Sequence, residues 1–275
     1  MQRCDENTII GREKELREWF TRGQDELMQE IDGLDIGWGA SQRWVTSNMP
    51  DITRGRHLDF ACGYGTFLAQ IGWRFPKANL YGLNIDYEGP HASIKRLLDQ
   101  ARVRVTLVQS DAREMPFASR SFDSVSCFLG LQDIQIGFGQ DGVRKAVSEA
   151  VRALKPNCCL TLADDFTFDT LLSLFDGQGV EVVSKDEFAL DVKWSRSVAE
   201  AAIRLYSEGW AAQSRVRGVQ EREEVRIDAY QRMKVEMELQ LRDKGFYVPH
   251  GPVRMVVVQK CYERSCRRNG KKGIA

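Results

Sequence analysis

The stretch His57-Leu58-Asp59-Phe60-Ala61-Cys62-Gly63-Tyr64-Gly65-Thr66-Phe67 predicts how this chain folds. An apolar run with an acid near its end is typical of a short buried strand, the two glycines of a tight turn, and the apolar residues from Thr66 onward of a helix. Glycine lets the backbone adopt positive φ and approach a ligand closely, and the first N–H groups of a helix have no partner within it. This arrangement favours a nucleotide-like cofactor.

The spacing of the glycines narrows the choice of cofactor. A dinucleotide site usually needs a third glycine where this chain has Leu68, and the Gly-Lys-Ser/Thr of a phosphate loop is absent. The pattern acid-x-x-x-Gly-x-Gly resembles motif I of the class I S-adenosylmethionine (SAM) dependent methyltransferases. The resemblance implies SAM as cofactor, with Asp59 facing its cationic end and the turn facing its carboxylate. The alternative is an ordinary strand–turn–helix whose glycines serve geometry alone.

Two further segments carry the same resemblance. The run MPFASRSFDSV, residues 115–125, resembles the family's lead into its fourth strand. The run RALKPN, residues 152–157, resembles the turn before its fifth strand, with Asn157 in place of a glycine. Together the matches cover roughly residues 55–165. They imply an α/β fold with a seven-stranded, mostly parallel, doubly wound Rossmann-like sheet and an antiparallel strand near the end.

The resemblance also implies a set of cofactor contacts. Asn84 stands where the family usually has an acid for the ribose hydroxyls, and Asp86 offers that charge two residues later, so we keep both. Asp111 would accept from the adenine amino group, and the next backbone N–H would bind a ring nitrogen. Asp86 and Asp111 could instead be turn-capping residues. The expected cofactor-binding residues are Asp59, Ala61, Gly63, Gly65, Asn84, Ile85, Asp86, Asp111, Ala112 and Leu129.

The acceptor site is less defined by sequence. Trp38 and Trp44 lie in a glycine-containing segment that we expect to be a loop over the pocket, although plain core packing is the alternative. Gln132 and Asp133 follow the fourth strand, where the transferred methyl would lie; Asp133 could equally cap a helix. No catalytic residue is assigned, because methyl transfer mainly requires alignment, and a base only if the nucleophile must lose a proton. The adjacent carboxylates of Asp164 and Asp165 are expected to be solvated turn residues, with a role toward substrate or as a base as the alternative.

Composition argues against several other classes of partner and ligand. Lys+Arg and Asp+Glu both number 39 in 275 residues, so no net charge attracts nucleic acid or an anionic membrane. There is no long apolar run or signal-peptide pattern, and seven cysteines without a CxxC pair favour reduced thiols in the cytoplasm. Three widely spaced histidines predict no metal site. Many members of the family that this chain resembles carry an Asn-Pro-Pro-Tyr type motif when they methylate an exocyclic amine, and its absence here argues against methylation of nucleic-acid adenine. The resemblance of residues 115–125 to small-molecule methyltransferases implies a small-molecule substrate, with a homodimer as an option.

The flanking regions complete the predicted organisation. We expect a helical cap over residues 1–50, a SAM-binding domain over 51–262 with a helical insertion at 195–245, and a basic, disordered tail over 263–275. The charged insertion could be a substrate lid, a dimer contact or an exposed helix pair, and its aromatic residues to test are Tyr206, Trp210 and Tyr230. The predicted reaction is in-line methyl transfer from SAM to a small molecule. The alternatives are an RNA- or protein-directed methyltransferase and a non-catalytic SAM-binding module.

Overall fold

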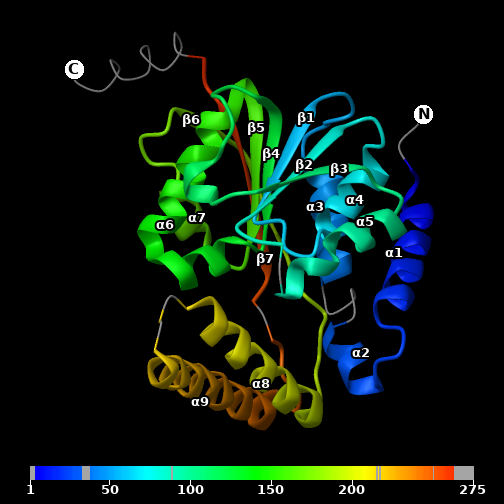
Figure 1. The fold of residues 1–275 in the computed structure, drawn as a ribbon, viewed down its shortest axis with the longest axis vertical. Coiled ribbons are helices and arrows are strands. Elements are labelled where there is room, and N and C mark those ends of the chain that lie inside the picture. Colours follow the sequence, from blue (N-terminus) through cyan, green and yellow to red (C-terminus); the bar gives the residue numbers. More distant parts are fainter. Residues whose placement is uncertain are drawn as a thin grey trace.

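A seven-stranded sheet forms the centre of the molecule (Figure 1). The computed structural model describes residues 4–32, 38–87, 89–214, 216, 218–249 and 251–262, and these statements refer to them. The strand order is β3-β2-β1-β4-β5-β7-β6, and only β7 runs antiparallel to its neighbours. This confirms the predicted mostly parallel fold. The strands are β1 (Arg56–Phe60), β2 (Asn79–Asn84), β3 (Val105–Gln109), β4 (Phe122–Phe128), β5 (Leu154–Asp164), β6 (Val180–Phe188) and β7 (Val253–Lys260).

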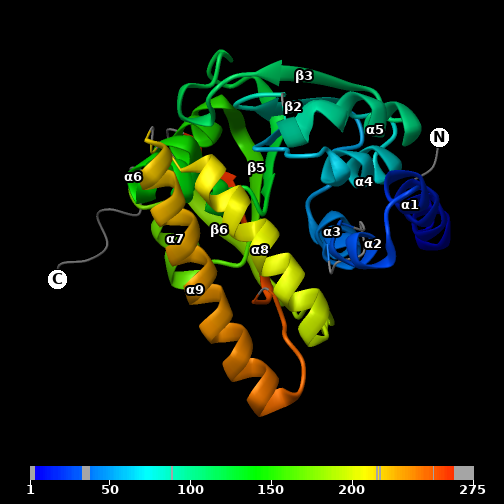
Figure 2. The ribbon, with the colours of Figure 1, turned by 60° about the horizontal axis from the view of Figure 1, so that its bottom comes forward.

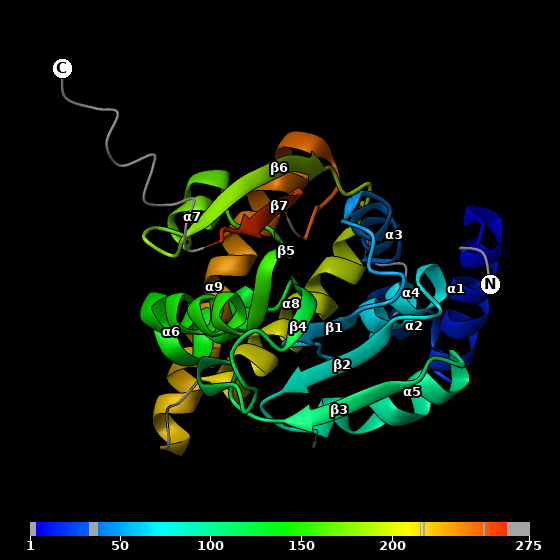
Figure 3. The same ribbon diagram turned by 90° about the horizontal axis from the view of Figure 1, so that it is seen from above.

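Helices cover both faces of the sheet (Figure 3). One face carries α6 (Leu131–Ala153) and α7 (Phe168–Ser173). The other carries α1 (Glu6–Phe20), α3 (Trp38–Asn48), α4 (Thr66–Arg74) and α5 (Ile94–Gln100), with α2 (Glu26–Asp32) between α1 and α3. Short 3-10 turns η1 (Gly89–Ser93) and η2 (Ala112–Glu114) precede or replace helices at two strand ends. None of the described helices is both long and apolar enough to cross a membrane.

Alternation along β1 separates two kinds of side chain. Leu58 and Phe60 join the apolar cluster under α6, so His57 and Asp59 point to the opposite face, under α4. All four side chains are buried. The strand therefore carries polar groups into the layer that adjoins the glycine turn.

The region before β1 corrects one expectation. We expected a loop over residues 36–44, but residues 38–44 belong to α3; residues 33–37 lie outside the described part. Val45 of α3 packs in the apolar cluster under α4, and the buried Gln42 Nε2 donates to Thr66 Oγ1 at 2.8 Å, which holds α3 on the start of α4. Tertiary packing thus outweighs the weak helix preference of a glycine-containing segment. The tail over 263–275 also lies outside the described residues.

A helical hairpin separates β6 from β7. It consists of α8 (Arg196–Gln213) and α9 (Val219–Lys244), within the segment predicted as an insertion. Phe188 at the end of β6 pairs with Val253 at the start of β7, so the hairpin leaves the sheet at the edge where the parallel strands end. There α8 contacts α2 and α6. Figure 2 shows α8 lying across this edge with α9 alongside it.

Candidate cofactor and acceptor site

The turn after β1 has an unusual backbone. Ala61, Gly63 and Gly65 have φ values of 52°, 51° and 81°, and α4 begins directly after Gly65. The left-handed conformation costs a residue with a Cβ atom about 1–2 kcal/mol, so Ala61 is strained while the glycines are not. Gly130, after β4, packs so closely here that a Cβ atom on it would lie 2.6 Å from Ala61 Cβ. The ends of β1 and β4 are thereby held together around the turn.

Asn84 braces this turn from β2. The Gly63 N–H donates to Asn84 Oδ1 at 3.1 Å, and Asn84 Nδ2 donates to the Gly63 carbonyl at 3.0 Å. Asn84 is only 4% exposed. Its amide therefore positions the backbone of the turn, a role that we had not expected from its alignment with the family's ribose acid.

The residues after Asn84 face outward. Ile85 is 51% exposed, which is high for a large apolar side chain beside a folded core. The Asp86 side chain is half exposed and lies 3.7 Å from His91 Nδ1. An exposed apolar face followed by an accessible carboxylate could contact an adenine ring and a ribose, respectively.

Asp59 is the buried acid of the site. It is 1% exposed, and its Oδ1 accepts a hydrogen bond from Ser126 Oγ at 2.6 Å. Burial raises the pKa of Asp59 to about 7, partly opposed by the hydrogen bond from Ser126. His57 Nε2 lies 3.0 Å from the same Ser126 Oγ. Sequence reasoning missed this link, although the signal was visible as alternating polar residues in two otherwise apolar strands.

Asp111 lies at the end of β3, as expected, and is already engaged. It accepts from the Arg113 backbone N–H at 2.9 Å and from Arg113 Nε at 3.0 Å, which makes it the N-cap of η2. The Arg113 guanidinium in turn stacks 3.4 Å from the centre of the Phe138 ring. Ala112 is buried beside it. The carboxylate is held in one orientation, because the Arg113 guanidinium contacts both of its oxygens.

The end of β4 supplies the remaining predicted residues. Leu129 has φ 52°, and its N–H donates to the Ala163 carbonyl of β5 at 2.8 Å. Gln132 is half buried and donates to the Asp165 carboxylate, while Asp133 is exposed in the first turn of α6. These groups lie one strand away from the glycine turn.

The expectation that the 164–165 pair is solvated was wrong for Asp164. This side chain is fully buried and accepts from the Leu131 and Asp165 backbone N–H groups, each at 3.1 Å. Burial raises the pKa of Asp164 well above its usual value. Asp164 therefore fixes the start of α6 from the end of β5, which only the folded chain could reveal.

Comparison with known proteins concerns the family and the fold. Residues 58–157 match a family described as Methyltransferase domain. The YcgJ protein of Bacillus subtilis shares the fold, with a TM-score of 0.55 at 14% identity over 81% of this chain and 99% of that one. Residues 58–157 are therefore similar to methyltransferase domains, and the chain shares the fold of the YcgJ protein.

Curated proteins similar to this chain are named as methyltransferases. The ubiquinone/menaquinone biosynthesis C-methyltransferase UbiE of Syntrophotalea carbinolica is 27% identical over 137 residues, 48% of this chain and 55% of that protein. The malonyl-[acyl-carrier protein] O-methyltransferase of Legionella pneumophila is 32% identical over 80 residues, 27% of this chain and 25% of that protein. The chain thus spans little more than half of the first of these relatives.

Two tryptophans lie on the helix that precedes the methyltransferase motif. Trp38 begins α3, and its side chain is outside the described part. Trp44 is half buried, with its ring 5.5 Å from that of Phe188 at the end of β6. Trp44 thus links α3 to the strand that leads into the hairpin, and its contact with an acceptor stays a prediction.

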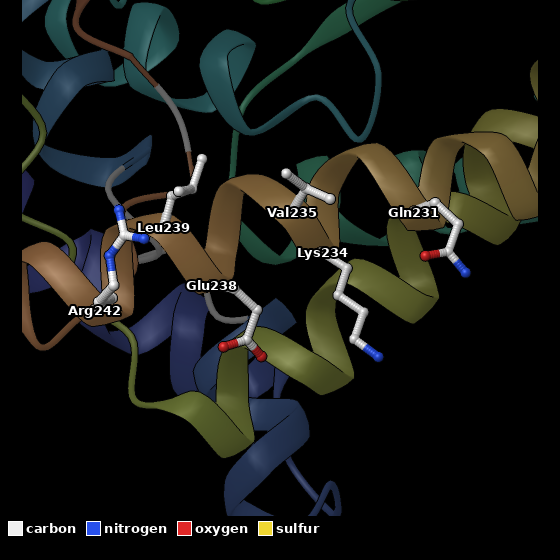
Figure 4. A pocket seen from close by; sticks show the side chains of 6 residues that line it. All are labelled: Gln231, Lys234, Val235, Glu238, Leu239 and Arg242. Carbon is white, nitrogen blue, oxygen red and sulfur yellow. The ribbon is translucent and has the colours of Figure 1, made fainter.

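The aromatic residues of the α8–α9 hairpin divide into two groups. Tyr206 and Tyr230 pack against the hairpin's own apolar cluster, whereas Trp210 is 38% exposed. A surface groove of about 550 Å³ runs along α9 (Figure 4). It is lined by residues of that one helix: Gln231, Lys234, Val235, Glu238, Leu239 and Arg242. None of these belongs to the elements that form the glycine turn.

Proposed function

We propose that this chain transfers a methyl group from SAM to a small-molecule acceptor. The observation that carries the proposal is an asymmetry of the glycine turn. A Cβ atom on Gly65 would meet Ile94 Cγ1 at 2.8 Å, whereas one on Gly63 would meet nothing within 4 Å. One side of the turn is packed against the protein and the other is open. A backbone of positive φ that faces open space beside a buried acid suits a ligand.

The residues present fit the parts of SAM. The Asp59 carboxylate would bind the ammonium, and the free N–H groups at the start of α4 would face the carboxylate. Asp86 would bind the ribose, while Ile85 would pack against the adenine and Asp111 would accept from its amino group. Bound SAM would supply a methyl group on a sulfonium, which leaves as a neutral thioether.

The chain contributes alignment and shielding. Leu129 and Gln132, at the end of β4, would border the acceptor and hold it in line with the methyl group. α3 on one side and α8 on the other would limit access of water to this edge. Asp165, a half-buried carboxylate directly after β5 that accepts from Gln132, could receive a proton from an acidic acceptor.

A small acceptor is supported by the relatives named for ubiquinone, menaquinone and malonyl-carrier substrates. The balanced charge of the chain, 39 basic against 39 acidic residues, gives no general attraction for nucleic acid. We place the acceptor between α3, α8 and the start of α6. The cytoplasm remains the compartment that we propose, from the reduced-thiol pattern.

Calorimetric titration with S-adenosylhomocysteine and, separately, with NAD tests the cofactor. We expect the former to bind and the latter not to bind. Asp59→Ala should weaken binding by roughly 100-fold, because it removes a charge-assisted contact. Asp186→Ala, at an exposed carboxylate on β6, is the matched control and should bind as wild type. Binding of NAD in place of S-adenosylhomocysteine would overturn the proposal.

Radiolabelled methyl transfer from SAM then tests the acceptor class. Demethylmenaquinone, malonyl-acyl carrier protein, bulk RNA and a denatured protein extract would be compared at equal enzyme concentration. We expect label in an organic-soluble small product. Label that enters RNA or protein alone would refute the small-molecule assignment and leave the methyltransferase assignment intact.

A further inference from the structure

A buried chain of four polar side chains crosses from β1 to β4. His57 pairs in register with Ser124, and Asp59 with Ser126. The four side chains are at most 4% exposed. His57 Nδ1 is hydrogen-bonded to Ser124 Oγ, and its Nε2 lies 3.0 Å from Ser126 Oγ, which lies 2.6 Å from Asp59 Oδ1. This series of hydrogen bonds ends at Asp59, the residue that we propose binds the cofactor's ammonium.

The direction of each hydrogen bond among these four side chains can be assigned. Burial lowers the pKa of His57 to about 3, so the ring is neutral and has one donor and one acceptor nitrogen. When Asp59 is a carboxylate it can only accept, so Ser126 donates its O–H to Oδ1. Ser126 Oγ then accepts from His57 Nε2–H, and Nδ1 accepts from Ser124. Every group in the chain has a partner, and all the donors point toward Asp59.

The other titratable groups around Asp59 leave its charge uncompensated. The thiols of Cys62 and Cys127 are buried, with pKa values raised by burial and by the nearby carboxylates, so they stay neutral. The pKa of the Tyr87 phenol, after β2, is raised as well. On the helical side, the neutral Gln70 of α4 is bonded to Glu13 of α1, which also pairs with Arg43 of α3.

No cationic side chain contributes to the pKa of Asp59 among the residues that the structure describes. Only Oδ1 has a hydrogen-bond partner within this part of the chain. The ammonium of a bound amino acid would therefore be the first positive charge to face this carboxylate. In its absence, a proton on Oδ2 is the alternative counter-charge.

We infer that Ser126 and His57 are positioning residues that favour the ionised form of Asp59. Binding of the cofactor's amino-acid end then releases one proton from the Asp59 carboxyl group. The inference rests on the proposed function. In the coupled step, the O–H bond at Asp59 Oδ2 breaks, the proton passes to solvent, and the ligand ammonium keeps all three of its own. The Ser126 hydrogen bond remains on Oδ1 throughout.

Calorimetry with S-adenosylhomocysteine between pH 5.5 and 9, in phosphate and in Tris, measures this coupling directly. Below about pH 7 we expect release of nearly one proton and a tenfold gain in affinity for each pH unit. Above about pH 8 the affinity should fall again as the ligand's own amine loses its proton. As a ligand control, 5′-methylthioadenosine lacks the amino-acid end and should bind with little dependence on pH.

Variants distinguish a positioning role from general stability. Ser126→Ala removes the donor to Asp59 and should move the acid-side midpoint up by about one pH unit, with binding roughly tenfold weaker below it. His57→Leu should raise the same midpoint by a smaller amount. His57→Gln should keep the wild-type midpoint, because its amide can still donate to Ser126. Ser207→Ala is the matched control, because this buried serine of α8 donates only within its own helix, to the Arg204 carbonyl at 2.7 Å.

The outcomes separate the two proposals. Wild-type affinity that is flat from pH 5.5 to 8, with no proton released, would overturn the coupling, as would a folded Ser126→Ala variant with the wild-type midpoint. Circular dichroism establishes folding, and if His57→Leu does not fold, Ser126→Ala with His57→Gln still decides the question. Failure of S-adenosylhomocysteine to bind at any pH would refute the proposed function itself.

Discussion

The glycine turn and the α8–α9 hairpin lie at the same edge of the sheet but are held by different forces. The turn depends on backbone conformation and on a few polar atoms, such as the Asn84 amide on Gly63. The hairpin depends on an apolar cluster that includes Trp194 and Met237, with exposed ion pairs such as Arg196–Glu238 outside it. Backbone requirements fix residue identity, whereas apolar packing accepts many side chains of similar volume.

The largest effect on stability should come from replacing a glycine by a residue with a side chain in the turn, compared with a glycine of the hairpin. Gly65→Val puts a β-branched residue at φ 81° and a Cβ atom 2.8 Å from Ile94, so we expect a loss of about 3 kcal/mol in the free energy of unfolding. Gly209→Ala in α8, where a Cβ atom meets nothing within 4 Å, should instead gain about 0.5–1 kcal/mol. Urea unfolding measures both. Equal effects would remove the contrast between the regions.

The next effect is the pH dependence of stability that arises from Asp59 and His57 on β1. Asp59 has its pKa raised to about 7, so its contribution to stability is lost as pH rises from about 4 to 7. His57 has its pKa lowered to about 3, so its contribution is lost as pH falls from about 6.5 to 3. The two slopes oppose each other where the windows overlap, which predicts a flat profile for the pair in the cofactor-free protein.

Variants at one position should separate the pH dependence of stability that is due to Asp59 from that due to His57. We expect Asp59→Asn to be about 2 kcal/mol more stable than wild type at pH 8 and to lose that advantage in acid, while it binds S-adenosylhomocysteine poorly. His57→Gln should gain stability at pH 5 and little at pH 8. Unfolding free energies at pH 5, 6.5 and 8 test this. If both variants kept the wild-type profile, the buried pair would have no part in the pH dependence.

The two regions also differ in how far sequence could predict them. Gly63 and Gly65 were predictable because their backbone geometry is local and nearly specific to glycine. The link from Ser126 to Asp59 joins residues 67 positions apart, so it needed the pairing of β1 with β4. The burial of Asp164 likewise depends on N–H groups from α6. Local rules thus predicted the strand, turn and helix of residues 57–67, and the family resemblance implied the seven-stranded sheet. The long-range hydrogen bonds around the turn became visible only in the folded chain.

Asn84 offers a smaller test that separates two roles. If the amide braces the turn, Asn84→Asp loses the donor to the Gly63 carbonyl and sets a negative charge beside that oxygen. We expect about 1 kcal/mol lower stability and fivefold to tenfold weaker binding of S-adenosylhomocysteine. If the residue binds ribose instead, the added charge should strengthen binding. Asn79→Asp, at the exposed start of β2, is the control.

The smallest effect on the fold should arise in the hairpin. Trp210 is 38% exposed on α8, so Trp210→Ala should change the free energy of unfolding by about 0.5 kcal/mol or less and leave S-adenosylhomocysteine binding unchanged. If α8 borders the acceptor, KM for the acceptor should rise severalfold while kcat changes little, because uniform binding energy is lost. Leu239→Ala, in the groove of α9, should alter neither constant. An equal rise in KM from both variants would show that the whole hairpin, and not α8 specifically, contributes to binding the acceptor.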